Sequence, residues 1–169
     1  MSPGEGASTD RQIVRLLQIC LLLERLLEIR IERQQDTFEP SEARTEQLLA
    51  ETKVQCTDHR RCLRQFVDQL GGDDVAGDQI DRLVAKQTDR YQDDVTGLLQ
   101  ECLHAEECIT RICDTLIDEI RGSSADLDAD RSALVAALEG IRQDELERIA
   151  DVSDALVDSG TPSSPRNTT

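Results

Sequence analysis

The sequence predicts an all-α protein built as a bundle of four long helices. Strand-like alternation is missing over residues 11–158, and helix-forming residues dominate there. Apolar residues in this region recur at the three-and-four spacing that gathers them on one side of a helix. Residues 1–10 and 159–169 are rich in Gly, Ser, Pro and Thr, and we expect them to be disordered tails. The predicted architecture is therefore one helical domain between two tails.

Caps and glycines mark the ends of the first two predicted helices. Asp10 can cap a helix that runs to about Gln34. The Pro-Ser pair at 40–41 begins a second helix, because proline favours the first helical position. This helix runs to Leu70, and the Gly-Gly pair at 71–72 ends it.

The third and fourth predicted helices follow similar rules. The third runs from about Asp94 to Arg121 and ends at Gly122. The fourth follows an acidic cap region at 126–130 and ends near Asp158. Acidic side chains suit a helix start because they face the positive end of the helix dipole.

The connection between the second and third helices is long. It contains a helical segment of its own, about Asp78–Gln92, which a short hairpin loop would not need. At a rise of about 1.5 Å per residue, such a segment covers much of the length of a bundle. We therefore expect one long crossover between the second and third helices, in place of a simple up-down-up-down order.

Composition excludes several classes of protein. The formal net charge of −16 repels phosphate backbones and anionic membrane surfaces, so we expect no nucleic-acid or membrane partner. The aromatic residues are only Phe38, Phe66 and Tyr91, too few for a base-stacking platform or an immunoglobulin-like sandwich. An acidic surface rich in Asp and Arg but poor in Lys indicates a halophilic type of protein, in a cytoplasm where salt screens the repulsion.

The N-terminal segment and the cysteines bear on the compartment. Residues 1–10 lack the basic start and apolar run of a signal peptide. The longest apolar stretch, 13–23, is interrupted by Arg15 and Gln18 and is too short to span a membrane. No pair of the six cysteines has C-x2-C spacing, which excludes a zinc ribbon or a thioredoxin-like motif. We therefore expect a cytoplasmic protein with reduced thiols.

On each predicted helix, we call the apolar side that is expected to face the core the core stripe. Each core stripe also carries polar side chains, and these lie near one level of the bundle. In chain order these are Glu24, Cys56, His59, Glu106, Glu145 and Arg148. A buried carboxylate costs several kcal/mol unless it is paired or binds a metal. One or two such groups from every helix therefore indicate a shared polar site inside the bundle.

This pattern resembles the ferritin-like superfamily, the relatives of bacterioferritin and rubrerythrin. In that architecture two helices each contribute one Glu, and the other two each contribute a Glu-x-x-His. The resemblance covers about residues 11–158. It implies that Glu24 and Glu106 are the single glutamates, that His59 is the ligand shortly before a Leu-Gly-Gly helix end, and that Glu145 opens the closing Glu-x-x-His.

Two positions depart from the family pattern. Cys56 stands where the family places a Glu, and Arg148 stands where it places the second His. A guanidinium cannot ligate a metal, so we expect Arg148 to form a bidentate ion pair with Glu106 and Glu145. The remaining half of the site could hold one zinc or another divalent ion, since carboxylate, thiolate and imidazole all suit zinc. The candidate metal ligands are Glu24, Cys56, His59, Glu106 and Glu145.

Three functions are compatible with these residues. The first is a ferritin-like protein for metal handling or stress protection that binds at most one zinc or iron ion and has no ferroxidase turnover, and so is not expected to be an enzyme. The second is a metal-free helical bundle, its glutamates neutralised by Arg148, that forms a homodimer or docks a protein partner. The first helix is apolar on more than one side and could supply that contact. The third is a di-iron oxidase, which Cys56 and Arg148 argue against.

Other metal-like or redox-like residues lie outside the core stripes. His104 falls off the stripe of its helix, so we expect the Glu-x-x-His at 101–104 to face solvent and not to bind metal. Cys62 has three arginines close to it in the sequence and is the best candidate for a thiol with a depressed pKa. We expect Cys62 and Cys108 to be partly exposed, and Cys20, Cys102 and Cys113 to fill the core.

Overall fold

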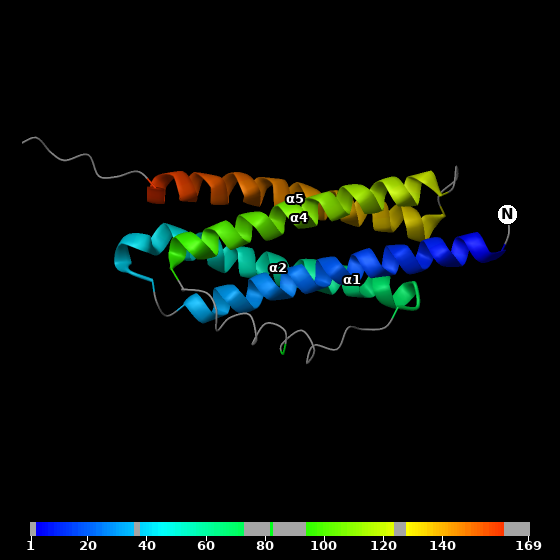
Figure 1. The fold of residues 1–169 in the computed structure, drawn as a ribbon, viewed down its shortest axis with the longest axis horizontal. Coiled ribbons are helices and arrows are strands. Elements are labelled where there is room, and N and C mark those ends of the chain that lie inside the picture. The colour runs from blue at the N-terminus through cyan, green and yellow to red at the C-terminus, as the bar shows by residue number, and fades with distance from the viewer. Residues whose placement is uncertain (1–2, 36–37, 73–81, 83–93, 124–127, 161–169) are drawn as a thin grey trace, which may run out of the picture.

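The computed structural model confirms an all-α bundle of four long helices (Figure 1). It describes residues 3–35, 38–72, 82, 94–123 and 128–160, and these contain no strand. None of the helices in these ranges combines the length and apolar content needed to cross a membrane. The elements are α1 (Pro3–Gln34), a short 3-10 turn η1 (Pro40–Glu42), α2 (Ala43–Gln69), α4 (Val95–Gly122) and α5 (Ala129–Gly160).

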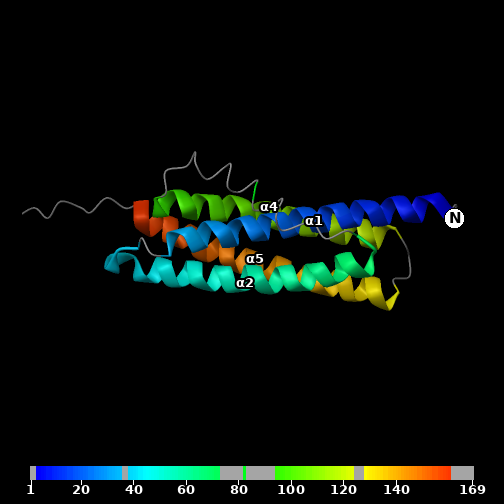
Figure 2. The same cartoon turned by 90° about the horizontal axis from the view of Figure 1, so that it is seen from below.

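The four helices form a ring of antiparallel neighbours (Figures 1 and 2). α1 packs on α2 and α4, and α5 packs on the same two helices from the other side. α2 and α4 run in the same direction, and the last turn of α2 lies at the opposite end of the bundle from the first turn of α4. These directions exclude an up-down-up-down order. The expected crossover falls on residues 73–93, which, apart from residue 82, lie outside the described residues.

α1 begins at Pro3, earlier than the predicted start at Asp10. The Asp10 carboxylate does not cap the helix; it accepts a hydrogen bond from Arg131 Nη2 of α5 at 3.1 Å. Because each residue added to an existing helix gains a backbone hydrogen bond, the helix extends beyond Asp10. The predicted tail over 1–10 is therefore helical from Pro3. At the other terminus α5 continues to Gly160, and residues 161–169 lie outside the described ranges.

α2 ends at the predicted Gly-Gly pair. Gly71 has φ +72°, the left-handed conformation that glycine adopts without penalty. The Gly72 N–H donates to the Val67 carbonyl at 2.9 Å, and the Gly71 N–H donates to the Asp68 carbonyl at 3.1 Å. These two bonds form a Schellman motif. A Cβ built on Gly72 would lie 2.5 Å from Val14 Cγ1, so this turn also packs closely on α1.

Alanine substitution of two glycines is expected to shift stability in opposite directions. Gly71→Ala should lower the free energy of unfolding by about 1–2 kcal/mol, because a Cβ is strained at a left-handed position. Gly140→Ala should raise it by about 0.5–1 kcal/mol, because Gly140 lies inside α5 with open space where a Cβ would go. Urea denaturation of both variants tests this pair. A loss of equal size in both would contradict it.

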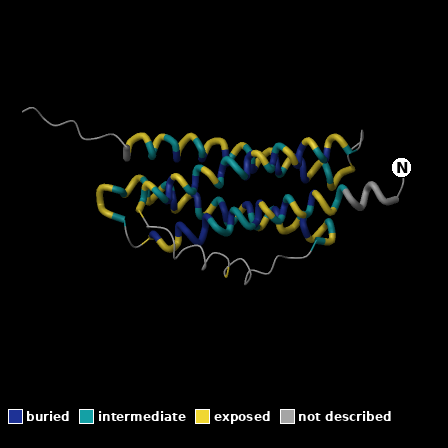
Figure 3. Tube along the Cα trace, viewed as in Figure 1, coloured by how far each residue is buried: buried dark blue, intermediate teal, exposed yellow. Residues whose placement is uncertain are grey.

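The buried side chains form two apolar clusters with a polar level between them. Figure 3 shows the buried positions along the inner sides of the helices. One cluster contains Leu17, Leu63, Ile109, Leu116, Leu138 and Ile141. The other contains Leu27, Ile31, Leu49, Leu98, Leu99 and Val152. The stripes predicted from the spacing are thus the core of the bundle, and the polar residues predicted on them are buried as well.

Candidate metal centre

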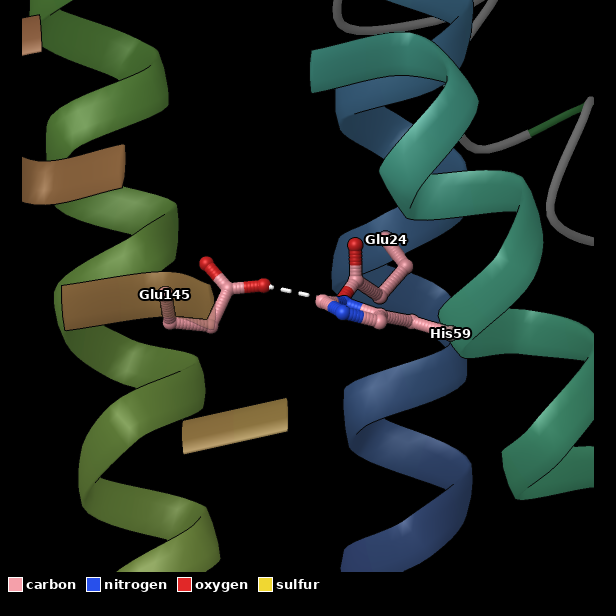
Figure 4. A group of neighbouring side chains, drawn as sticks. All are labelled: Glu24, His59 and Glu145. Carbon is pink, nitrogen blue, oxygen red and sulfur yellow. Dashed lines mark hydrogen bonds and ion pairs between the residues drawn. The ribbon is translucent and has the colours of Figure 1, made fainter. Parts of the chain in front are cut away.

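Glu24 of α1, His59 of α2 and Glu145 of α5 meet in the centre of the bundle, and we call them the triad (Figure 4). Each is at most 5% exposed. His59 Nδ1 lies 2.8 Å from Glu24 Oε1 and 3.2 Å from Glu145 Oε1. One ligand atom from each residue lies within 4.8 Å of the other two. Ligand bonds of about 2.0–2.2 Å place neighbouring ligand atoms about 3–4 Å apart, so small shifts would make a metal site.

Apolar neighbours at helical spacing turn each triad member inward. Glu24 lies between the buried Cys20 and Leu27 on α1, and His59 lies one turn before the buried Leu63 on α2. Glu145 follows the buried Ile141 on α5. Because residues three and four apart share one helix face, burying the apolar members buries the polar ones with them.

Asp144 contacts the other side of the His59 ring. Its Oδ2 lies 3.0 Å from His59 Nε2, and its side chain is 46% exposed. Metal-ligating histidines commonly donate their second ring N–H to a carboxylate, which fixes the orientation of the ring. Asp144 was not among the site residues predicted from the sequence. Asp144 lies off the α5 stripe, and only the packing of α5 against α2 brings it to His59.

The carboxylates around His59 keep its ring protonated. Burial acts to lower the pKa of His59, but hydrogen bonds to Glu145 and Glu24, together with the Glu24 charge, raise that pKa to about 11. The ring is therefore a cation at neutral pH and donates from both nitrogens. Burial, with the Glu24 charge adding to it, raises the pKa of Glu145, although the hydrogen bond to His59 opposes this shift. Without a metal, a histidine cation holds the two carboxylates together.

Glu106 of α4 is a further buried carboxyl at the same level. Among the described residues, no N–H or O–H group donates to either Glu106 oxygen or to Glu24 Oε2. Burial and the charge of Glu145 raise the pKa of Glu106 to about 9, although the charge of Arg148 opposes this shift. Leaving such groups unpaired costs about 1–3 kcal/mol each. Unpaired buried oxygens beside the triad are consistent with a polar ligand held there.

The predicted bidentate pair of Arg148 with Glu106 and Glu145 is wrong. Arg148 Nε donates to Gln55 Oε1 at 3.3 Å, and Nη1 lies 3.8 Å from Glu51 Oε2. Both partners belong to α2. Arg148 is itself buried, with 10% of its side chain exposed, and its guanidinium is oriented towards α2. The guanidinium therefore does not take the place of a metal between the glutamates.

Cys56 lies beside the triad but outside the group of atoms within 4.8 Å of one another. Burial first, and then the charge and a hydrogen bond of Glu24, raise the pKa of the Cys56 thiol well above its usual range. The thiol is therefore protonated. Of the five candidate ligands, the structure brings Glu24, His59 and Glu145 together and leaves Cys56 and Glu106 next to them.

The Glu-x-x-His at 101–104 faces away from the site, as predicted. His104 is exposed, and the Glu101 carboxylate accepts two hydrogen bonds from Arg30, at 2.7 and 2.9 Å. Cys62 and Cys108 are partly exposed, also as predicted. Burial raises the pKa of Cys62, however, so the depressed pKa expected of a redox-sensing thiol is wrong.

No protein-family model matches the chain, and no curated protein matches it significantly. The likeness to ferritin-like proteins remains a prediction that rests on the polar level and the helix order.

Proposed function

We propose that this protein is a ferritin-like metal-binding bundle that holds one divalent cation, zinc or iron, at Glu24, His59 and Glu145. The observation that carries this proposal is the triad itself, with three ligand atoms within 4.8 Å of one another at a level between two apolar clusters. The proposed role is metal handling or stress protection in the cytoplasm. Ferroxidase turnover is not proposed, because Cys56 and Arg148 replace two ligands of a di-iron site.

The chemistry of the donors supports this proposal. Carboxylate oxygen and imidazole nitrogen are ordinary ligands of zinc and iron. His59 Nδ1 would bind the ion together with one oxygen from each glutamate, while Asp144 would hold the ring through Nε2. A bound cation would supply positive charge to a buried site rich in carboxyls, where Glu106 and Glu24 have unpaired oxygens.

A second candidate is a metal-free bundle with an interaction role. It is favoured by the protonated His59, which hydrogen-bonds both triad glutamates without any ion. One or two buried polar groups can also set the register of packed helices. Under this reading the outer side of α1, where Ile19 is exposed, would form the homodimer or dock a partner. Sedimentation tests the dimer, and a monomer at every salt concentration would contradict it.

Metal titration separates the two candidates. Protein purified without chelator is expected to bind one zinc or iron ion per chain, measured by elemental analysis and calorimetry. Glu24→Gln, His59→Ala and Glu145→Gln should each weaken binding by more than the roughly 10–100-fold that loss of an outer partner costs. Glu147→Gln and His104→Ala are matched controls, because both residues are exposed. If the native protein binds no ion after incubation with zinc or iron, the metal-free candidate stands.

A further inference from the structure

A groove of about 620 Å³ lies between α2 and α5 and reaches the triad. Its lining includes Glu51, Val54, Asp58 and His59 of α2, with Asp144 and Arg148 of α5. His59 is the triad member in that lining. The α2–α5 contact is also the least extensive of the four helix contacts in the ring. The bundle is thus most open on the side where the candidate ligand His59 lies.

The His59 ring spans from this groove to the buried carboxylates. Its Nε2 faces Asp144, whose side chain is half-exposed, and its Nδ1 faces Glu24 and Glu145 inside. Along the bundle axis, apolar clusters close both sides of the polar level. An ion that leaves water for the triad therefore meets the least apolar barrier at the His59 ring.

The charges of the groove favour a cation. Its length carries the exposed carboxylates of Glu51 and Asp58 and the half-exposed carboxylate of Asp144. Two cations of the lining oppose these carboxylates: Arg148, which is held by Gln55, and the protonated ring of His59. Outside the lining, Arg61 lies 3.8 Å from Asp58. The three carboxylates of the lining outnumber its two cations. Carboxylates lining a cleft raise the local concentration of cations and speed their association, and salt weakens this effect.

We propose that the α2–α5 groove is the entrance through which a divalent cation reaches the triad, with Asp144 the last carboxylate before His59. This inference rests on the proposed metal site. Beyond Asp144, which contacts His59 Nε2, the cation passes the His59 ring to reach the oxygens of Glu24 and Glu145. Charge on the groove walls therefore controls the rate of loading.

Two arginine substitutions of exposed valines test the entrance. Val54 lines the groove and is 62% exposed, whereas Val157 near the end of α5 is 70% exposed and is not in the lining. Val54→Arg and Val157→Arg add the same charge. Zinc uptake at low salt, followed by stopped flow with a chromogenic zinc indicator, should slow about tenfold in Val54→Arg and change less than twofold in Val157→Arg. The final zinc stoichiometry should not change.

The outcomes separate the entrance from the site itself. If the native protein binds zinc but both arginine variants load at the native rate, the entrance is overturned and the metal site stands. If the native protein binds neither zinc nor iron, the proposed function fails and the entrance fails with it. Asp58→Asn provides a second test, since this substitution should slow zinc uptake and reduce the dependence of the uptake rate on salt. An unchanged rate and salt dependence in Asp58→Asn would also overturn the entrance.

Discussion

Replacing His59 by alanine is expected to lower the free energy of unfolding of the metal-free protein by about 3–5 kcal/mol. The histidine cation lies 2.8 Å from Glu24 and 3.2 Å from Glu145, and all three side chains are buried. Removing it leaves two buried carboxyls facing each other without the cation that lies between them. Urea denaturation at neutral pH with a chelator present, followed by circular dichroism, measures the change.

The second histidine of the chain provides the control. His104 is exposed on α4, so His104→Ala should change the free energy of unfolding by no more than about 0.5 kcal/mol. A small change in both variants would show that the His59 cation does not hold the carboxylates together. It would also remove the observation that favours the metal-free candidate.

The metal-free protein is expected to lose a few kcal/mol of stability as the pH rises from about 5 to 9. The pKa of Glu106 is raised from 4.5 to about 9 in the folded state, so the unfolded chain releases this proton first. Because the unfolded state then binds fewer protons, stability falls through this window. His59 acts in the same direction: its pKa rises from 6.5 to about 11, so its stabilising contribution is complete below pH 6.5 and is lost towards pH 11.

Glu106→Gln should flatten this dependence. The amide keeps the shape of the carboxyl and cannot ionise, so the loss of stability between pH 5 and 9 should be smaller than in the native protein. Glu107→Gln is the control, because Glu107 is the next residue of α4 and is only half-buried. Unfolding free energies at pH 5, 7 and 9 test all three proteins. Equal slopes in the native protein and Glu106→Gln would show that Glu106 is already ionised when folded.

The rules for capping residues and helix-ending glycines predicted most helix ends correctly. Gly71 adopts the left-handed conformation at the end of α2, and Asp94 caps α4 with a hydrogen bond from the Gly97 N–H. Both features depend only on residues that are close in sequence. The start of α1 was missed because Asp10 pairs with Arg131, which is distant in sequence. A potential cap is thus decided by tertiary contacts as well as by its neighbours.

The sequence by itself determined which side chains enter the core. Spacing placed Glu24, His59, Glu106 and Glu145 on the inner stripes, and all four are buried. Burial follows from the periodicity of a single helix, since the apolar neighbours carry the polar residue inward. That is why the position of the candidate site along the bundle could be predicted without an alignment of homologous sequences.

Only the tertiary structure decided which of these groups meet. The rotation and height of each helix against its neighbours brought Asp144 to His59 and left Glu106 unpaired. They also let Arg148 reach Gln55 on α2 in place of the glutamates. Periodicity within one helix carries no information about distances between helices, and a long side chain can turn to either side of its own stripe. The packing of α2 against α5 therefore decided both the partners of His59 and the groove that leads to it.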